Sequence, residues 1–489
     1  MIDLTVNAKQ AELNAKHCKE RGILLPTFDE MKNPEKISGK IKTELKQIGL
    51  WDFNPKNLFR ITWANEPVEK GGGFGGVNYM VLPPELTGCK ANIVALVGKW
   101  FPTGAHKVGA TYGCLAPRLV TGQFSPQTHK AVWPSTGNYC RGGAYVASLL
   151  GCESIAILPE EMSRERFEWL QTVAGEVIAT PGCESNVKEI FDKCWELKKT
   201  RTDITIFDQF EELGNPLWHY HVTGSAIEEA LGKVMGPDGK LFAGVFSSGS
   251  AGTMAAGYYL KDKFGDVKVA AAEALQCPTL LNNGFGGHRI EGIGDKHVPW
   301  IHDMKKTDMV IAVDDEVTMR MMRLFNEEKG RQSLARQGVS QELIQRLDLL
   351  GISGIGNLVA SIKLAKYYEL TEKDYVVTVL TDSMEMYASR LRELTDEKGE
   401  YTEYDACRDI ERLDAINIET MQELNYYDKQ RIHNLKYFTW IEQQGKELDE
   451  LNAQWYDENY WRNKFSAYKE LDEKIKEFNE RTGLLKKYQ

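Results

Sequence analysis

The stretch Leu241–Thr253 reads LFAGVFSSGSAGT, an apolar run that passes directly into a turn of serine, glycine and alanine. A helical pattern begins right after it, at Met254. This order is typical of an α/β unit, in which a buried strand feeds a helix at the edge of a parallel sheet. Small residues let such a turn close around a phosphate at the positive end of the helix dipole. The candidate phosphate-binding residues are Ser248, Gly249, Ser250, Ala251, Gly252 and Thr253.

The same alternation of short β-branched runs and helical stretches extends from about Lys130 to Ser383. It predicts an α/β fold with a mostly parallel sheet. The other candidate strands are Ala131–Trp133, Ser154–Leu158, Glu176–Ala179, Ile204–Phe207, Val267–Glu273, Met309–Val313 and Tyr375–Leu380. The run Gly351–Gly356 is interpreted as a turn that leads into a buried helix over Asn357–Tyr368.

The last hundred residues differ, because charge and aromatic content rise together and no strands are expected there. Apolar residues at steps of three or four predict an amphipathic helix, with Gly483 in the place of a C-cap. These residues are Trp461, Phe465, Tyr468, Leu471, Ile475 and Phe478. We expect this helix to pack over the chain's own lobes or over a sister subunit.

Composition narrows the class of protein. The chain has 489 residues, 42% of them hydrophobic and 27% charged, which favours two globular lobes plus an appendage. A net charge of -10 argues against nucleic acid or an anionic membrane as the main partner. There is no apolar run of membrane-spanning length and no signal-peptide core, so a cytoplasmic location is expected. Nine cysteines without a C-x-x-C pair indicate buried thiols, and no metal site is expected.

The segment Phe101–Lys107 is predicted to be a turn, and its last residue, Lys107, lies at the expected start of a helix. Lysine forms Schiff bases with aldehydes, and desolvation lowers its pKa toward the range where it is useful. By itself the pattern also fits a surface lysine that begins a helix.

Two further turns carry candidate side chains. Pro134–Tyr139 combines hydroxyls, an amide and main-chain N–H groups before a helix, which suits a substrate carboxylate; an ordinary capped turn is the alternative. Thr381–Ser383 ends a strand at the carboxyl edge of the sheet, where α/β proteins bind ligands. A hydroxyl there could face a cofactor, and a simple strand-terminal turn is again the alternative.

Taken in this order, the four segments resemble the fold-type II pyridoxal-phosphate enzymes of the cysteine synthase and cystathionine β-synthase family, a branch of the tryptophan synthase β-like superfamily. The resemblance covers roughly residues 82–391. The further matching segments between these four are Pro159–Arg166, Gln209–Phe210, Asn215–Pro216, His219–Tyr220, Thr223–Gly224 and His288–Gly294. So many ordered matches are far more specific than any one motif.

The resemblance implies a role for each matching residue. Lys107 is expected to bind pyridoxal 5'-phosphate as a Schiff base and later to move the α-proton of the substrate. Asn138 is expected to meet the phenolic oxygen of the cofactor, Ser248–Thr253 its phosphate and Ser383 its ring nitrogen. The expected substrate-binding residues are Ser135, Thr136, Gly137, Tyr139, Gln209 and Gly292.

The implied architecture has an N-terminal extension over residues 1–80, a catalytic core over 81–390 and a helical C-terminal extension over 391–489. Within the core, a small lobe of about residues 110–205 is inserted in the large lobe. The implied reaction is β-elimination or β-replacement on a β-substituted L-amino acid, of the serine, O-activated serine or cysteine type, through an aminoacrylate. A homodimer or higher homo-oligomer is expected by resemblance, and an additional subunit stays open.

The sequence departs from cysteine synthases where the substrate is chosen. Thr136 stands where serine is usual, Tyr139 replaces a small hydroxyl residue, and Lys107 is followed by Val108-Gly109. These departures keep open an ammonia-lyase or dehydratase of the diaminopropionate or threonine/serine type, which would form a keto acid and ammonia. A non-catalytic or subunit-dependent protein with this fold is the competing hypothesis. His219 and His221 are interpreted as structural residues and not as metal ligands.

Overall fold

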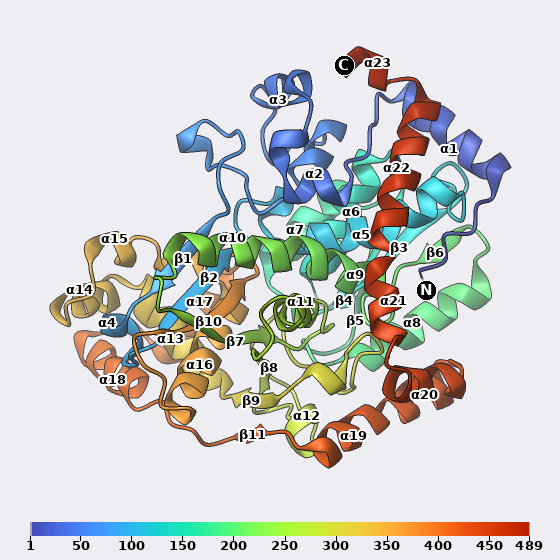
Figure 1. The fold of residues 1–489 in the computed structure, drawn as a ribbon. Coiled ribbons are helices and arrows are strands. Elements are labelled where there is room, and N and C mark those ends of the chain that lie inside the picture. The colour runs from blue at the N-terminus through green and yellow to red at the C-terminus, as the bar shows by residue number, and fades with distance from the viewer. Residues whose placement is uncertain (1, 136, 489) are drawn as a thin grey trace.

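The computed structural model describes residues 2–135 and 137–488, which form two separate β-sheets covered by helices (Figure 1). The larger sheet has the strand order β1-β2-β10-β7-β8-β9-β11, and the smaller has the order β5-β4-β3-β6. The strands are β1 Tyr79–Leu82, β2 Asn92–Val97, β3 Lys130–Pro134, β4 Ser154–Pro159, β5 Glu176–Thr180, β6 Ile204–Ile206, β7 Lys240–Ser247, β8 Lys268–Ala274, β9 Met309–Val313, β10 Asp374–Leu380 and β11 Met421–Glu423. Only the edge strands β1 and β11 pair antiparallel; the other described neighbours are parallel.

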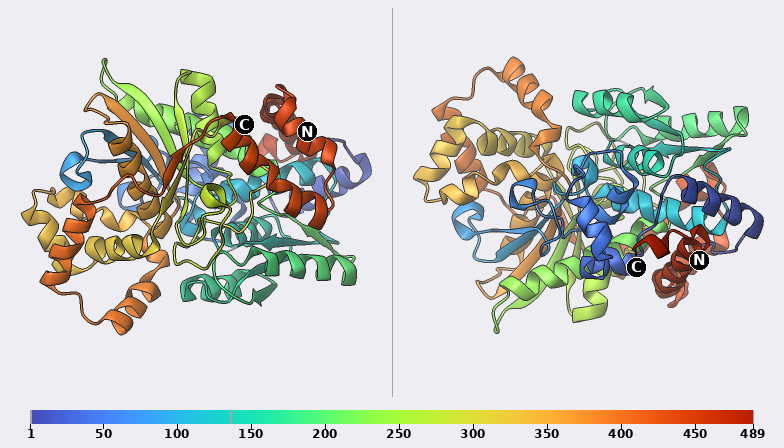
Figure 2. Two further views of the ribbon diagram at one scale, coloured as in Figure 1. Left: turned by 90° about the horizontal axis from the view of Figure 1, so that it is seen from below. Right: turned by 90° about the horizontal axis from the view of Figure 1, so that it is seen from above.

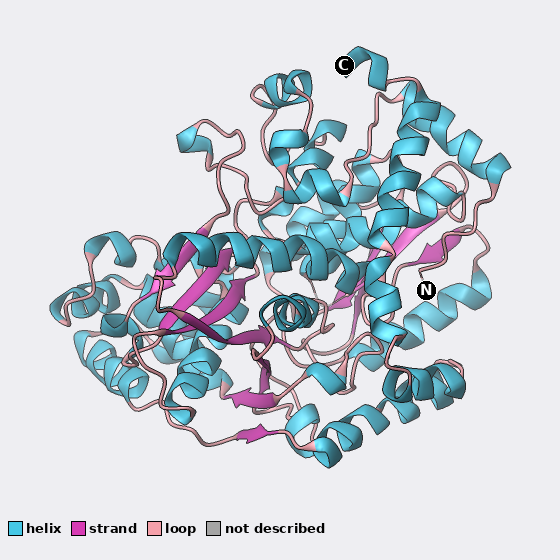
Figure 3. Ribbon diagram, in the orientation of Figure 1, coloured by secondary structure: helices cyan, strands magenta, loops and turns pink. Residues whose placement is uncertain are grey.

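Helices lie on both faces of the sheets (Figure 3). Those of the core are α5 Lys107–Thr121, α6 Asn138–Leu149, α7 Arg164–Val173, α8 Val187–Thr200, α9 Gly214–Trp218, α10 Gly224–Val234, α11 Met254–Phe264, α13 Asp315–Asn326, α14 Glu328–Arg336, α16 Ile352–Tyr367, α17 Ala388–Lys398 and α18 Glu403–Asp414. A π-helical turn over His219–Thr223 joins α9 to α10. The predicted α/β fold class, with parallel sheets flanked by helices and a helical C-terminal part, is confirmed.

Alternate residues of each central strand enter different cores, as a sheet covered on both faces requires. In the large sheet, Val94 and Leu96 of β2 belong to a core shared with α10 and α11. Their neighbours Ile93 and Ala95 belong to a second core shared with α13 and α16. In the small sheet, Val132 packs with α8 on one face, while α5 and α6 cover the other. Because the central strands of both sheets are parallel, the loops at their carboxyl ends, which carry the site, lie at one edge of each sheet.

The predicted strands of the core agree with the structure to within about two residues at their ends. The interpretation of Gly351–Gly356 as a turn is wrong, because α16 begins at Ile352 and Gly351 is its N-cap. A Cβ on Gly354 would lie 3.1 Å from Leu380 Cδ2. The glycines therefore allow α16 to lie close against β10, and they do not interrupt it.

The expectation of no strand in the last hundred residues is also wrong, since β11 pairs antiparallel with β9. Met421–Glu423 has neither β-branched residues nor an alternating pattern, so this strand rests on main-chain pairing with an exposed edge. Strands β1 and β2 lie before the region in which strands were predicted.

The two ends of the chain pack together over helix α5 (Figure 2). The N-terminal helices are α1 Ala8–Glu20, α2 Phe28–Lys32 and α3 Gly39–Leu45; the C-terminal ones are α19 Tyr426–Asn434, α20 Leu448–Tyr456, α21 Tyr460–Ser466, α22 Tyr468–Thr482 and α23 Leu485–Tyr488, with a π-helical segment over Tyr437–Gln443. Helix α22 contacts both α1 and α5, and Gly483 ends it at a φ of +71°. The predicted amphipathic helix is thus two successive helices, with the expected left-handed glycine at its end. Of the helices described, none is both long and apolar enough to cross a membrane.

Candidate active site

Lys107 is the first residue of α5, and its amine reaches the serine-glycine turn that follows β7. Lys107 Nζ donates to Ser250 Oγ at 3.0 Å and to Gln209 Oε1 at 3.4 Å. Burial lowers the pKa of the Lys107 ammonium to about 8, although the carboxylates of Asp295 and Glu184 act in the opposite direction. A neutral amine is therefore accessible near physiological pH, which a nucleophile or a general base requires.

The main chain before Lys107 is fixed against the end of β10. His106 N–H donates to the Thr381 carbonyl at 3.2 Å, and His106 Nε2 lies 3.2 Å from Thr381 Oγ1. Thr103 adopts a φ of +69°, which is uncommon outside glycine. These contacts place Lys107 beside the Thr381–Ser383 turn, so segments about 270 residues apart in the sequence meet.

The turn Ser248–Thr253 lies between β7 and α11 and has the geometry of an anion cradle. Ala251 has a φ of +61°, and within the part of the chain that the structure describes the N–H groups of Gly249–Thr253 donate to no protein acceptor. A Cβ on Gly252 would lie 2.1 Å from Asn215 Oδ1. Asn215 Nδ2 in turn donates to Ser250 Oγ at 3.1 Å. Open main-chain donors at the N-terminus of a helix fit a phosphate group.

A second loop brings Asn138 and Ser383 to the same edge. Asn138 is the first residue of α6, and its Nδ2 donates to Asp382 Oδ2 at 2.6 Å. Asn138 Oδ1 and Ser383 Oγ are both buried, and neither has a hydrogen-bond partner in the described chain. Buried polar atoms without partners are rare in folded proteins, and here they fit the polar atoms of a bound ring.

The expected carboxylate loop is only partly described. Gly137 N–H donates to Ser135 Oγ at 3.0 Å, and Gly137 has a φ of +157°. Thr136, also expected to bind substrate, lies outside the described residues. Tyr139 is buried, and its ring packs edge-on against Trp133 with centroids 5.5 Å apart. Ser135 and Gly137 therefore lie in the loop before Asn138, which contacts Asp382, whereas Tyr139 is part of the hydrophobic core.

Gly292 lies in the loop after β8, which packs against the Ser248–Thr253 turn. A Cβ on Gly249 would lie 3.1 Å from the Gly292 carbonyl oxygen, and Gly294 N–H donates to the Ser248 carbonyl at 3.1 Å. Gly292 has a φ of +98°, a conformation that favours glycine. The loop is thus fixed over the turn that Lys107 reaches.

A network of buried charged side chains connects the loops around Lys107. The Arg166 guanidinium forms an ion pair with Glu291 and donates to Tyr387 OH at 2.8 Å. Tyr387 OH donates to Asp382 Oδ2 at 2.7 Å, and a Cβ on Gly137 would lie 2.6 Å from Arg166 Nη1. A buried network of this kind holds the loops of both sheets in one arrangement.

Sequence reasoning gave no role to Asn215, Glu184, Asp295 or Asp382, all of which are buried around the site. Asn215 and Asp382 stand in matched or quoted segments, and Asp295 directly follows the matched run that ends at Gly294. Their positions in these segments could have indicated that they lie in the site. The residues they contact come from distant parts of the chain, so these contacts could not be predicted from the spacing of residues in the sequence.

The two histidines interpreted as structural are bound within the protein. His219 Nδ1 lies 2.9 Å from Thr223 Oγ1, and His221 Nε2 lies 2.7 Å from the Phe465 carbonyl oxygen.

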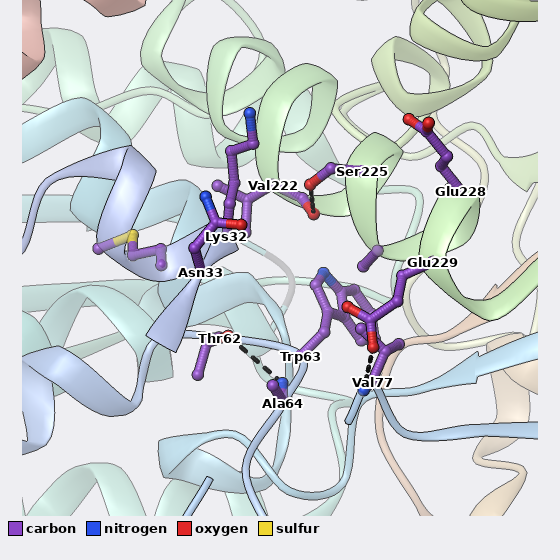
Figure 4. A pocket seen from close by; sticks show the side chains of 12 residues that line it. Lys32, Asn33, Thr62, Trp63, Ala64, Val77, Val222, Ser225, Glu228 and Glu229 are labelled. Atoms are coloured by element: carbon purple, nitrogen blue, oxygen red, sulfur yellow. Dashed lines mark hydrogen bonds between the residues drawn. The ribbon is translucent and has the colours of Figure 1, made fainter. Parts of the chain in front are cut away.

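Figure 4 shows a different cavity, of about 330 Å³, whose walls include Lys32, Trp63 and Glu229. Trp63 also packs against His106, with ring centroids 5.5 Å apart. The indole therefore lies between this cavity and the segment that carries Lys107. Of the predicted site residues that the structure describes, none lines this cavity.

Comparisons with known proteins agree with this geometry. Residues 98–332 match the family described as pyridoxal-phosphate dependent enzyme. Cysteine synthase of Staphylococcus aureus is 30% identical over 260 residues, which are 53% of this chain and 75% of that protein. Cystathionine beta-synthase of Saccharomyces cerevisiae is 27% identical over 316 residues, 63% of this chain; the match spans only 59% of the yeast protein.

Solved structures show the same fold. O-acetyl serine sulfhydrylase isoform 3 from Entamoeba histolytica superposes with a TM-score of 0.56 at 22% identity, over 69% of this chain and 93% of that one. The O-acetylserine dependent cystathionine beta-synthase from Helicobacter pylori gives a TM-score of 0.53 at 24% identity, over 64% and 94% of the two chains.

Proposed function

The chain belongs to the family of pyridoxal-phosphate dependent enzymes, and we propose that it catalyses β-replacement or β-elimination on a β-substituted L-amino acid. The observation that carries this proposal is the 3.0 Å approach of Lys107 Nζ to Ser250 Oγ, inside a turn whose main-chain donors are open. A scaffold protein would need neither a lysine of lowered pKa nor an open anion cradle beside it.

The residues present fit the cofactor. Its phosphate would rest on Ser248–Thr253, its ring would meet Asn138 and Ser383, and Lys107 would hold its aldehyde carbon. Ser383 offers a neutral hydroxyl to the ring nitrogen, and its Oγ has no other partner among the residues that the structure describes, which supports this placement. When bound, pyridoxal phosphate supplies the electron sink that makes the α-proton of an amino acid acidic.

Lys107 is the proposed base for the α-proton. The amine must be neutral to accept that proton, and the pKa of about 8 leaves roughly a tenth of it neutral at pH 7. Gln209 and Ser250 orient the amine through the hydrogen bonds described above. They would also keep it close to the substrate after it is displaced.

The substrate carboxylate is proposed to bind at the N-terminus of α6, where Ser135, Thr136 and Gly137 supply hydroxyl and main-chain donors. The N-terminal end of a helix attracts an anion, which supports this placement. Gly292 would close over the substrate from the opposite loop. Tyr139 would act only indirectly, by setting the position of α6.

We also propose a homo-oligomer, with a dimer as the simplest form, in the cytoplasm. Exposed aromatic side chains on the C-terminal helices support self-association, among them Tyr427 at 77% and Tyr456 at 68% exposure. The nine cysteines are free, which suits a reducing compartment.

A substrate panel tests the proposed reaction. The protein loaded with cofactor is incubated in turn with serine, O-acetylserine, O-phosphoserine, cysteine, threonine and 2,3-diaminopropionate, with and without a thiol. A new thioether or thiol amino acid indicates replacement, and a keto acid with ammonia indicates elimination. Loaded protein that transforms none of these substrates would exclude the proposed reaction.

A further inference from the structure

Asp295 is a buried carboxyl group for which the reaction described above has no use. Its side chain is only 6% exposed, and its Oδ2 has no hydrogen-bond partner among the residues that the structure describes. A carboxyl oxygen that is both buried and unpartnered is costly, so its retention calls for a functional explanation.

The loop that carries Asp295 is fixed to the candidate active site. Gly294 N–H donates to the Ser248 carbonyl at 3.1 Å, and Thr279 Oγ1 donates to the Asp295 carbonyl at 2.6 Å. His288 Nε2 lies 3.2 Å from the Gly294 carbonyl oxygen. Asp295 is therefore held beside the turn that Lys107 reaches, and it does not lie on a free loop.

Lys107 and Asp295 influence each other's charge without a direct bond. The Lys107 ammonium donates to Ser250 and Gln209, and in the described chain it forms no ion pair with Asp295. Burial raises the pKa of the Asp295 carboxyl to about 8, and the charge of Lys107 is the influence that opposes this rise. The carboxyl thus favours its protonated form at neutral pH, and its loop is hydrogen-bonded to the turn that the Lys107 amine reaches.

We propose that Asp295 is a second catalytic acid-base residue of this site, which protonates the group leaving the β-carbon and later deprotonates the incoming nucleophile. The proposal rests on the proposed function. Lys107 takes the α-proton; the bond from the β-carbon to the leaving oxygen or sulfur breaks, and the electron pair departs on that atom. The same atom takes the Asp295 proton and leaves as water or as hydrogen sulfide. In replacement, the resulting carboxylate accepts the proton of the incoming thiol as its sulfur bonds to the β-carbon.

This role selects a class of substrate. Hydroxide is a strongly basic leaving group that departs readily only when it is protonated, and hydrosulfide is a weaker base that gains less from protonation, whereas acetate and chloride leave as stable anions. The inferred substrates are therefore L-serine and L-cysteine, with an unactivated hydroxyl or thiol at the β-carbon.

The test compares leaving groups in the Asp295→Asn variant. We expect kcat/KM to fall about 10²- to 10³-fold with L-serine, and by a smaller factor with L-cysteine because hydrosulfide is a weaker base than hydroxide. It should change less than about threefold with O-acetyl-L-serine and β-chloro-L-alanine, because an acid is not needed for their departure. Asp303→Asn is the matched control, since Asp303 is also buried but caps the short helix Met304–Lys306, where it accepts from Lys305 N–H. This control should leave the ratio between the two substrate classes unchanged.

Two measurements without turnover accompany the kinetics. Cofactor titration should give the same affinity for wild type and Asp295→Asn, and the infrared difference between them should show a protonated carboxyl band below about pH 8. An equal loss with all four substrates, or no loss with any, would overturn the role of Asp295. Failure of the wild type to bind the cofactor or to act on any substrate would instead overturn the proposed function.

Discussion

Two helices of this protein, α2 and α11, differ in whether the main-chain N–H groups at their N-termini have an acceptor within the protein. At α2, the N–H groups of Phe28 and Asp29 donate to the carboxylate of Asp472 on α22, at 2.7 Å and 3.1 Å. At α11, the described N–H groups of Gly249–Thr253 have no protein acceptor. The N–H groups of α2 are closed, in the sense that a side chain of the protein accepts their hydrogen bonds, and this contact joins the two ends of the chain. Those at α11 are open, without such an acceptor, and this difference distinguishes a structural helix start from one that is available to a ligand.

The largest effect is expected at the open end, from Lys107→Ala. Without the amine the protein should bind no covalent cofactor, stay colourless and lose turnover by at least about 10³-fold. Visible absorption and steady-state kinetics measure both losses. Lys233→Ala is the matched control, because Lys233 is an exposed lysine that pairs with Glu229 on α10 at 2.6 Å. A coloured and active Lys107→Ala variant would break the comparison.

The next effect is expected from Gly252→Ala, which alters the cradle without touching the lysine. The added methyl would meet Asn215 Oδ1, which cannot retreat easily because Asn215 Nδ2 donates to the Gln209 carbonyl at 2.9 Å and to Ser250. Overpacking of this kind costs about 1–3 kcal/mol, so cofactor affinity should fall about 10- to 100-fold in a spectroscopic titration.

Gly232→Ala on α10 is the control for this variant, since no atom lies within 4 Å of its added Cβ. Alanine there should leave cofactor affinity unchanged and raise stability by roughly 0.5–1 kcal/mol. Equal affinity in both variants would show that the turn does not hold the phosphate.

At the closed end, Asp472→Ala should lower the free energy of unfolding by about 1–3 kcal/mol, because a buried N–H group at Phe28 and a half-buried one at Asp29 lose their acceptor. Urea unfolding measures this loss, with the exposed Glu470→Ala on the same helix as control. Cofactor affinity should not change. A large change in affinity would mean that the two helix starts are not independent.

The smallest effect is a pH dependence. Burial lowers the pKa of Lys107 to about 8, and only the neutral amine attacks an aldehyde. The rate of cofactor capture by the cofactor-free protein should therefore rise about tenfold between pH 7 and pH 9 and then level off. A free lysine side chain in the same buffers, with a pKa of about 10.4, should gain about a hundredfold over that interval. A hundredfold rise in the protein would contradict the lowered pKa.

The sequence was sufficient to predict the core strands from β3 to β10, although not β1 and β2, and it indicated most of the loops that the structure groups around Lys107. Strands such as β7 and β10 are apolar runs bounded by turns, and the residues grouped around Lys107 follow strand ends, where parallel sheets gather their loops. Gly351–Gly356 was misinterpreted because glycine can permit close packing as well as a turn, and only the approach to Leu380 decides between these.

The closed end and the partners of the site could not be predicted in the same way. Asp472 is separated from Phe28 by more than 400 residues, and nothing in either segment indicates the other. The role of Asp295 depends on its burial beside the loops around Lys107, which the sequence does not show. Strand β11 forms because it pairs with the edge of β9, which local sequence does not show either. Such contacts are set by tertiary packing, which local patterns do not record.

The most direct test of the account is reductive trapping of the cofactor. The protein is loaded with pyridoxal phosphate, reduced with borohydride, digested and analysed by mass spectrometry. We expect the pyridoxyl phosphate mass on the peptide that contains Lys107 and on no other lysine. Its absence from that peptide, or its presence on another lysine at equal yield, would contradict the central claim that this amine and the open turn form one cofactor site.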